Sequence, residues 1–410
     1  MAAQRFNKLL SHNSQSFTLI EMLITIAIIA VLMTVTVVAI NPNEMTKKAR
    51  DTQRLTDMSN LQMIMELARS EGMLNSSYCD GTKIYASLPS ETLLSNSNLP
   101  SGVSWAQVSR DNIRNADGTG WLPFNFKNLV GLQVTVLPVD PKNSLNDSLY
   151  YTFYCNPQRQ YIFTAYPESK TFGPKGGKDS KTIADGGPDP YVYEVGNNLF
   201  ISPLKPVGSW SFEEGGDTTA YDSSGNNNHG TLKNGPTWTD GQINKALSFD
   251  GTDDYVDIND FQLGGEITVE GWIYPKSHQY WQRLLDFGNG PASDNIVFAA
   301  SQGTTGQPLL DVYVGSTYYR ASSSDPITLN SWHHLVGVLG GKKVKLYVDN
   351  VLKADVTGPA GLNNLIRTNN FIGKSNWSAD SYFKGSIDEV RIYNRALSAE
   401  EIKRHYEMSK

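Results

Sequence analysis

One carboxylate stands at the start of a long apolar run. Glu21 precedes the uncharged segment 22–40, and the basic residues Arg5 and Lys8 lie upstream of it. A run of this length can just span the hydrocarbon core of a bilayer as a helix. A carboxylate in the run raises the cost of membrane burial by about 3 kcal/mol, so a positive charge has to compensate it. In a filament core of stacked helices, the amino terminus of a neighbouring chain can supply that charge.

The residues around Glu21 carry a motif. Segment 16–21 is Ser-Phe-Thr-Leu-Ile-Glu, and it resembles the cleavage and methylation site of type IV prepilins. The resemblance implies that a prepilin peptidase cuts between Ser16 and Phe17 and that Phe17 becomes an N-methylated first residue. It also implies that Phe17 and Glu21 mediate assembly with other pilin subunits. Ser16 departs from the family, because pilin leaders usually end in glycine.

Two simpler explanations of the apolar run fit less well. A secretory signal peptide has an apolar stretch of about 7 to 15 residues and a small-residue cleavage site, which Val37 and Ala39 would supply. The run is longer than that and begins with a charge. A plain single-pass anchor explains the length and, with Arg5 and Lys8 kept inside, the orientation. Because neither explains the motif, we predict a single-pass inner-membrane (cytoplasmic-membrane) protein with an extracytoplasmic C-terminus that later enters an extracellular filament.

The chain has two cysteines, Cys79 and Cys155, both downstream of the apolar run. A disulfide is permitted outside the cytoplasm, and closing a loop of this size would stabilise the fold by roughly 4 kcal/mol. Two unpaired buried thiols are the alternative, and the cysteine spacing matches no metal site. We predict the disulfide.

The charge distribution limits the class of ligand. Residues 1–205 hold 18 basic and 17 acidic side chains, and residues 206–410 hold 17 and 24. An acidic half without a basic stripe argues against nucleic acid and favours cations or neutral ligands such as sugars. The one basic cluster is interleaved with Asp51 and Asp57, which favours a solvated helix face over DNA contact; it comprises Lys47, Lys48, Arg50 and Arg54.

The sequence pattern predicts the helices and strands that position the motif, the cysteines and the basic cluster. After a leader at 1–16, segment 17–71 has helical periodicity with a weak point at Asn41-Pro42. We predict one helix of roughly 80 Å, with 17–40 as the transmembrane or filament-core part and an amphipathic second part. A pilin-like head at 72–200 would follow, with loops over 79–114 and strands at 133–137, 149–155 and 160–166; the last two would form a hairpin. The proline-flanked segment 201–206 suits an extended linker.

From residue 207 to about 408 the pattern changes to short alternating strands, which is typical of an antiparallel β-sandwich. Turn residues predict hairpins at Asp250-Gly251 and at Asp349-Asn350. Ser398 and Glu401 form a capping box that predicts a closing helix.

The same region resembles laminin-G-like, concanavalin-A-like jelly-roll domains. The motifs that carry the resemblance are Trp210-Ser211-Phe212, Asp222-Ser223-Ser224-Gly225, Ala246 to Gly251, Trp332 to Leu335 and Ile387 to Asn394. We therefore predict an α+β pilin fold, a long N-terminal helix with a small antiparallel β head, followed by an all-β jelly-roll sandwich. The family also implies a possible Ca²⁺ site, because it places oxygen ligands in the segments that hold Asp222, Asn226, Asp250 and Asp388. Asx turns are the alternative for these residues.

Catalysis is not predicted. Some relatives of the wider jelly-roll superfamily cleave β-glucans with paired carboxylates, and a retaining pair lies about 5 to 5.5 Å apart. Glu266 and Glu270 would be separated by about 13 Å of strand, so we expect both to face solvent. His333 and His334 are adjacent on a strand and point to opposite faces, so we expect structural roles for them.

Aromatic residues in loops are the candidates for ligand contact, because sugar rings stack on flat apolar faces. These residues are Tyr280, Trp281, Tyr319 and Trp377, with Tyr318 beside Tyr319. We therefore predict a minor or tip pilin whose lectin-like module binds carbohydrate or an extracellular protein for adhesion. The alternative is a pseudopilin with a structural role in a type II secretion or DNA-uptake machine.

Overall fold

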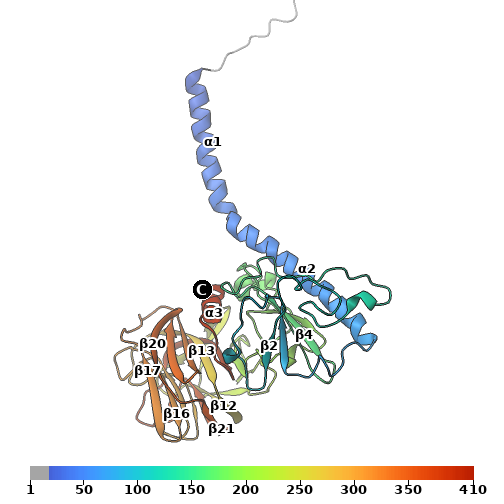
Figure 1. The fold of residues 1–410 in the computed structure, drawn as a ribbon. Helices are drawn as coiled ribbons and strands as arrows, with labels where there is room; N and C mark the ends of the chain where they lie inside the picture. The colour runs from blue at the N-terminus through green and yellow to red at the C-terminus, as the bar shows by residue number, and fades with distance from the viewer. Residues whose placement is uncertain (1–17) are drawn as a thin grey trace, which may run out of the picture.

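The stem consists of two helices. The computed structural model describes residues 18–410, without the side chains of 34–40, so the leader 1–16 and the predicted processing residues Ser16 and Phe17 lie outside the described residues. Helix α1 (Leu19–Ile40) is followed by α2 (Pro42–Ser70), and the chain changes direction between them (Figure 1). The predicted long helical segment is confirmed, and it is interrupted at its predicted weak point, Asn41-Pro42.

Asn41 separates the two helices. It has a left-handed backbone (φ 45°), and its side chain accepts a hydrogen bond from the backbone N–H of Glu44. Proline disfavours helical geometry in the residue before it, and asparagine tolerates the left-handed region better than most residues. Asn41 thus ends α1 and caps α2 at the same time.

The start of α1 is closed by a capping box. Thr18 N and Oγ1 both donate to Glu21 Oε2, at 2.9 Å each, so the carboxylate lies against the first turn of its own helix. Among the side chains that the structure describes, no helix combines the length and the apolar character needed to cross a membrane.

Helix α2 packs on the head, which contains a five-stranded sheet in the order β2-β1-β3-β4-β5. The pairing of β1 with β2 is parallel and the other pairings are antiparallel, so the head is not purely antiparallel. The predicted strand at 133–137 is absent; one isolated bridge joins Val136 to Asn115 there. The elements are β1 (Lys83–Ala86), η1 (Asn96–Asn98), β2 (Ser104–Ala106), η2 (Phe126–Asn128), β3 (Tyr151–Cys155), β4 (Tyr161–Ala165), η3 (Pro174–Asp179), β5 (Tyr193–Gly196) and η4 (Leu199–Ile201).

A buried ion network fixes α2 to the head. Arg54, 2% exposed, donates from Nε to Asp140 Oδ2 at 2.6 Å and from Nη2 to Glu168 Oε1 at 2.9 Å. Asp51 accepts hydrogen bonds from the backbone N–H groups of Glu168 and Ser169. Arg54 and Asp51 therefore do not belong to a solvated face, contrary to the prediction, because they satisfy the backbone and carboxylates of the head.

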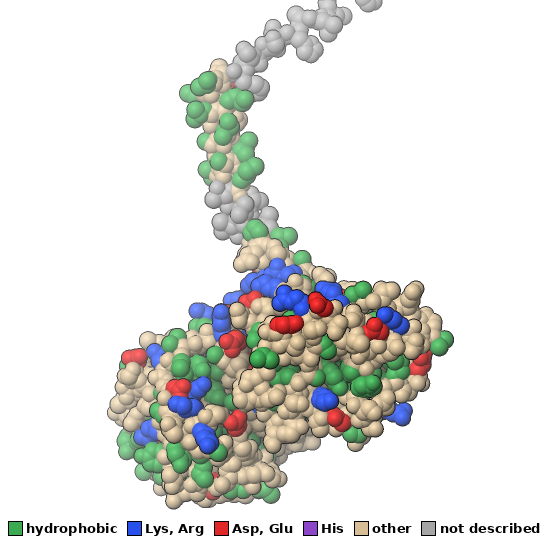
Figure 2. Space-filling model, in the orientation of Figure 1, with side chains coloured by type: hydrophobic (Ala, Val, Ile, Leu, Met, Phe, Trp, Pro, Cys, Tyr) green, Lys and Arg blue, Asp and Glu red, His purple; other side chains and the backbone are tan. Residues whose placement is uncertain are grey.

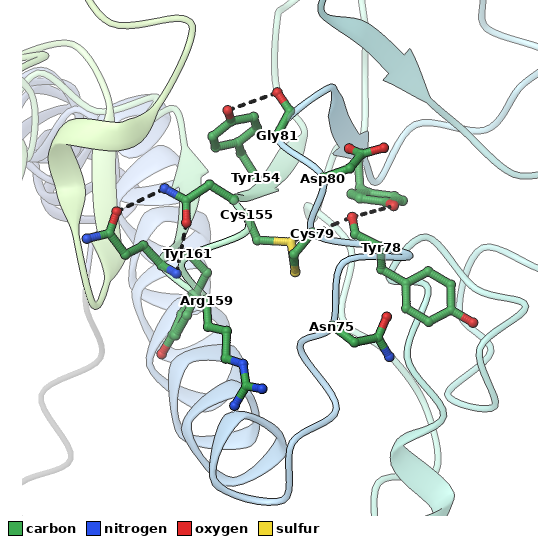
Figure 3. Close-up of a disulfide and its surroundings, with 12 residues drawn as sticks. Asn75, Tyr78, Cys79, Asp80, Gly81, Tyr154, Cys155, Arg159 and Tyr161 are labelled. Carbon is green, nitrogen blue, oxygen red and sulfur yellow. Dashed lines mark hydrogen bonds between the residues drawn. A yellow bond between two sulfur atoms is a disulfide. The ribbon is translucent and has the colours of Figure 1, made fainter.

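Cys79 and Cys155 form a disulfide that joins the segment after α2 to the end of β3 (Figure 3). Beside it, Tyr154 donates from its hydroxyl to the carbonyl of Gly81 at 3.0 Å. The bridge and this hydrogen bond hold the loop after α2 against the sheet.

The C-terminal module is a sandwich of two eight-stranded antiparallel sheets, which confirms the predicted jelly-roll class. The first sheet has the order β20-β19-β18-β13-β23-β10-β9, with β6 beside β23; the second has the order β17-β16-β15-β14-β22-β11-β8-β7. The first comprises β6 (Gly208–Trp210), β9 (Thr237–Asp240), β10 (Lys245–Asp250), β13 (Ile267–Pro275), β18 (His333–Gly340), β19 (Lys343–Val348), β20 (Val351–Thr357) and β23 (Lys384–Tyr393). The second comprises β7 (Thr219–Ala220), β8 (Gly230–Lys233), β11 (Tyr255–Ile258), β14 (Arg283–Gly288), β15 (Ile296–Ala299), β16 (Leu309–Val314), β17 (Thr317–Ser322) and β22 (Asn369–Ile372), while β12 (Phe261–Gly265) pairs with β21 (Leu362–Arg367).

One of the two predicted hairpins in the module is confirmed. Asp349 and Asn350 both have positive φ and join β19 to β20, with Val348 opposite Val351. The hairpin predicted at Asp250-Gly251 is wrong, because β10 pairs within the first sheet and β11 within the second. That turn carries the chain across the sandwich.

Helix α3 (Ala399–Ser409) lies between the module and the head (Figure 1). The capping box of Ser398 and Glu401 starts it, as predicted. His405 of α3 stacks on Tyr191 of the head, with ring centroids 4.2 Å apart. The segment predicted as a linker, 201–206, is also held against the module, because Arg395 donates to the carbonyl of Leu204. The head and the module therefore share a buried interface.

Candidate ligand-binding surface

The outer face of the second sheet carries polar and aromatic side chains. Strand register places Tyr318 opposite Tyr313 and Arg320 opposite Asp311 on this face. Arg283 and Asp286 are three positions apart and would point to opposite faces of a regular strand. The register of β14 against β15 shifts between Arg283 and Leu285, and this bulge lets both side chains reach the outer face.

Aromatic rings and guanidinium groups alternate on this face. The Arg283 Cζ atom lies 5.7 Å from the Trp377 ring centroid and 5.5 Å from that of Trp281. The Arg320 Cζ atom lies 5.1 Å from the ring centroids of both Trp281 and Tyr318. We call the series Trp377, Arg283, Trp281, Arg320 and Tyr318 the aromatic–arginine ladder. Cation–π contacts of this kind hold flat rings in fixed positions.

Each arginine of the ladder is held by a carboxylate. Arg320 makes two hydrogen bonds to Asp311, at 2.8 and 2.7 Å, and these hydrogen bonds raise the pKa of Arg320. Arg283 donates from Nη2 to Asp380 Oδ2 at 2.7 Å. Arg283 is 4% exposed, and its Nε and Nη1 atoms have no hydrogen-bond partner within the described part of the chain.

Two loops bring the tryptophans to the ladder. Trp281 has a left-handed backbone (φ 53°) and donates its N–H to the carbonyl of Gly303. A bulky residue in this region is strained, and such strain is concentrated at functional sites. The loop of Trp377 is tied to the first loop, because Ser381 N donates to Tyr280 O at 2.8 Å.

Asp286 anchors the Trp377 loop from below. It accepts hydrogen bonds from Asn376 N at 3.0 Å and from Asn376 Nδ2 at 2.9 Å. Burial raises the pKa of Asp286. The ladder is thus built on hydrogen bonds that exist before any ligand arrives, and it presents rings and polar groups together.

The predicted ligand-contact residues divide into three groups. Trp281 and Trp377 belong to the ladder, and Tyr280 lies beside it, 49% exposed and edge-on to Trp281. The prediction that Tyr319 contacts a ligand is corrected, because Tyr319 lies opposite Val312 and packs against the main core of the sandwich. Successive residues of a strand face opposite sides, so Tyr318, 51% exposed, takes the outer position.

Two ladder residues, Arg283 and Arg320, lie outside the predicted set. The alternation of β17 carries a signal for Arg320 and for the outward position of Tyr318, since Tyr319 and the buried Ala321 point inward. Nothing in the local sequence indicates the outward position of Arg283, because it depends on the bulge.

The structure does not assemble the four predicted metal ligands into one site. Asp222 accepts hydrogen bonds from the backbone of Ser209, Ser224 and Asn228, and Asp388 accepts one from the backbone of Ile243. The predicted Asn226 donates its side-chain amide to Val207 O. Asp222 therefore caps its own turn through Ser224 N, as in the alternative explanation, whereas Asp388 and Asn226 bind backbone groups that are distant in the chain.

Another acidic group includes the predicted Asp250. It consists of Asp250, Asp253 and Asp254, whose carboxylate oxygens lie within 4.8 Å of one another. Among the described side chains, no other three acidic, histidine or cysteine residues come this close together. Burial and the two neighbouring carboxylates raise the pKa of Asp254.

The strand carboxylates do not form a pair. Glu266 accepts a hydrogen bond from Gly341 N at 2.7 Å, whereas Glu270 is fully buried under α3. The prediction that Glu270 faces solvent is wrong, because His405 Nδ1 lies 3.0 Å and Arg391 Nη1 3.7 Å from it. Burial opposes the ionisation of Glu270, but His405 and His334 hold its pKa well below the ordinary value. His333 contacts Asp349 at 2.8 Å on the other face.

Two segments of the chain match known families. Residues 11–37 match the prokaryotic N-terminal methylation motif. Residues 250–403 match the concanavalin A-like lectin/glucanases superfamily. No curated protein shows significant sequence similarity to the chain.

Three solved structures with similar folds each cover half of the chain or less. Domain 4 of AbnA, an extracellular arabinanase from Geobacillus stearothermophilus in complex with arabinotriose, is 24% identical, with 50% of this chain and 99% of that chain covered and a TM-score of 0.43. A Trypanosoma rangeli sialidase in complex with 2,3-difluorosialic acid is 16% identical, with 49% and 32% covered and a TM-score of 0.38. A pentraxin from Limulus polyphemus is 13% identical, with 38% and 79% covered and a TM-score of 0.32.

Proposed function

We propose that this chain is a subunit of a type IV pilus-like filament and that its C-terminal module binds carbohydrate for adhesion. The proposal rests on the combination of a prokaryotic N-terminal methylation motif with a concanavalin A-like module in one chain. The motif supports processing by a prepilin peptidase and assembly with other pilin subunits through Phe17 and Glu21. Before assembly, α1 would anchor the chain in the cytoplasmic membrane, with the head and the module outside.

The size of the module supports a minor or tip position. A sandwich of about 200 residues is as large as a separate domain. One copy on every subunit would crowd a filament in which the heads pack around a helical core. Occasional or terminal subunits have room for such a module.

The aromatic–arginine ladder carries the proposal of carbohydrate binding. The exposed ring of Tyr318 and the half-buried rings of Trp281 and Trp377 offer flat apolar faces, on which the C–H faces of a sugar can stack. Between the rings, Arg320, whose side chain is 28% exposed, can donate hydrogen bonds to sugar hydroxyl groups. Since the side chains are already fixed, binding costs little rotamer entropy.

We propose binding rather than cleavage. A glycoside hydrolase needs two carboxyl groups on either side of the scissile bond. The burial of Glu270 beneath α3 separates it from any sugar on the module surface. Polysaccharide turnover by the full chain would contradict this part of the proposal.

We also propose that the module binds Ca²⁺, with Asp250, Asp253 and Asp254 among the ligands. Ca²⁺ prefers six to eight oxygen ligands, and the three carboxylates supply some of them.

A glycan array probed with the detergent-solubilised full chain tests the function. We expect a defined set of glycans to bind, and Trp281→Ala to weaken that binding at least about tenfold, which corresponds to about 1.4 kcal/mol. Trp332→Ala is the matched control, because Trp332 is a half-buried tryptophan that contacts Tyr274 away from the ladder. Binding that survives Trp281→Ala would contradict the ladder as the site.

Surface labelling of intact cells tests the display of the module. An adhesin has to be reachable from outside, so we expect a membrane-impermeant reagent to label the module. A chain that is labelled only after the envelope is opened would instead fit a pseudopilin.

A further inference from the structure

A basic cleft lies at the end of the body next to the stem. Figure 2 shows lysine and arginine side chains gathered where the stem meets the body. The cleft has a volume of about 390 Å³ and is formed by the start of α2, the loop at 142–149, the segment at 168–170 and α3. Its basic residues, which define the basic cleft, are Lys47, Lys142, Lys170, Lys403, Arg404 and Lys410.

Most of the acidic residues that line the cleft are already paired. Asp147 lies 3.5 Å from Lys142, and Glu407 lies 3.8 Å from Lys403. Glu168 is held by Arg50 and Arg54 in the network under α2. Glu400 is the remaining acidic lining residue.

Several cationic groups in the cleft remain available. The side chain of Lys47 makes no hydrogen bond or ion pair within the part of the chain that the structure describes. Lys170 Nζ donates only to the carbonyl of Lys410, at 3.1 Å. Arg404 donates a hydrogen bond from Nη1 to the carbonyl of Pro167, while its buried Nε has no hydrogen-bond partner among the described residues. The cleft therefore carries a net positive charge and unused donors.

The position of the cleft indicates its partner. Lys47 lies five residues after Pro42, where α2 begins next to the end of α1, which is about 8 Å along that helix. The headgroup region of a bilayer extends roughly 5 to 8 Å beyond the hydrocarbon on each side. If α1 is anchored in the membrane, as the proposed function requires, the cleft faces the headgroups within about one Debye length.

We propose that the basic cleft binds the phosphate headgroup of an anionic phospholipid in the membrane that holds the stem. Ammonium and guanidinium groups donate to phosphate oxygens, and basic residues near a membrane are attracted by anionic lipids. The contact fixes the head and the module against the membrane surface before the subunit enters a filament. Arg50 and Arg54 take no part, because they are neutralised by the head.

Titration of the full chain in a neutral detergent tests this proposal. The probes are dihexanoyl phosphatidylglycerol, dihexanoyl phosphatidylcholine, inorganic phosphate and a DNA duplex. We expect phosphatidylglycerol to bind most tightly and Lys47→Gln with Lys170→Gln to weaken it about fivefold for each lysine. The control Lys276→Gln with Lys342→Gln removes two exposed lysines of the module and should change nothing.

Three results would overturn the proposal. They are equal binding of the two lipids, unchanged binding by the double cleft variant, and tighter binding of DNA or inorganic phosphate than of phosphatidylglycerol. Flotation with neutral vesicles separates this failure from that of the proposed function. A chain that floats but does not discriminate the lipids refutes the cleft alone, whereas a chain that does not float refutes the membrane anchor.

Discussion

Tyr191 of the head contacts the module directly. It is fully buried, stacks on His405 at 4.2 Å and receives a hydrogen bond on its hydroxyl from Arg391 Nη1 at 3.1 Å. Tyr191→Phe keeps the ring and removes the hydroxyl with its hydrogen bond to a charged group, so we expect it to lower the free energy of unfolding by about 2 kcal/mol. Tyr191→Ala also removes the ring and opens a cavity beside Met408, so we expect a loss of about 4 to 6 kcal/mol.

Urea unfolding of the full chain in mild detergent, followed by the fluorescence of the tryptophans, measures these changes. We expect the wild type to unfold in one transition and Tyr191→Ala to separate the transitions of the head and the module. Tyr280→Ala is the control, because Tyr280 is 49% exposed and should change stability by less than about 0.5 kcal/mol. If Tyr191→Ala unfolds with the midpoint and single transition of the wild type, the buried interface does not couple the two parts.

Three further outcomes are expected. Burial raises the pKa of Asp185 to about 7, above its value of about 4 in an unfolded chain, so its stabilising effect is complete below about pH 4 and is lost as the pH rises through 7. Asp185→Asn should therefore flatten the fall in Tm between pH 5 and 8, and an identical pH profile would contradict this. Replacing Cys79 and Cys155 by serine should lower the free energy of unfolding by about 4.5 kcal/mol in the chain-entropy model; urea midpoints unchanged under oxidising conditions would refute it. Millimolar Ca²⁺ should raise the Tm of the wild type but not that of Asp254→Asn, and equal shifts would place any calcium elsewhere.

Local chemical rules predicted local structure well. The capping box of Ser398 starts α3, and the positive φ angles of Asp349 and Asn350 close the hairpin of β19 and β20. Asp250-Gly251 also forms a turn, but turn residues do not specify which sheet the next strand joins. The break at Asn41 was visible as a weak point, because Pro42 restricts it, and the left-handed backbone of Asn41 decided that the helix ends there.

The errors came from long-range contacts. Glu270 is buried by His405, 135 residues away in the chain, and no local pattern encodes that contact. Arg54 is buried by Asp140 and Glu168 for the same reason. At the ladder, loop aromatics were found from composition, but choosing Tyr318 over Tyr319 required the register of β17 against β16.

We propose that this chain is a processed filament subunit. Mass spectrometry of the mature protein, purified from cells that express it with its natural export and processing machinery, measures the processing itself. We expect the first residue to be Phe17 and its amino group to carry a methyl group. A mature chain that begins at Met1, or after a cut near Ala39, would contradict it.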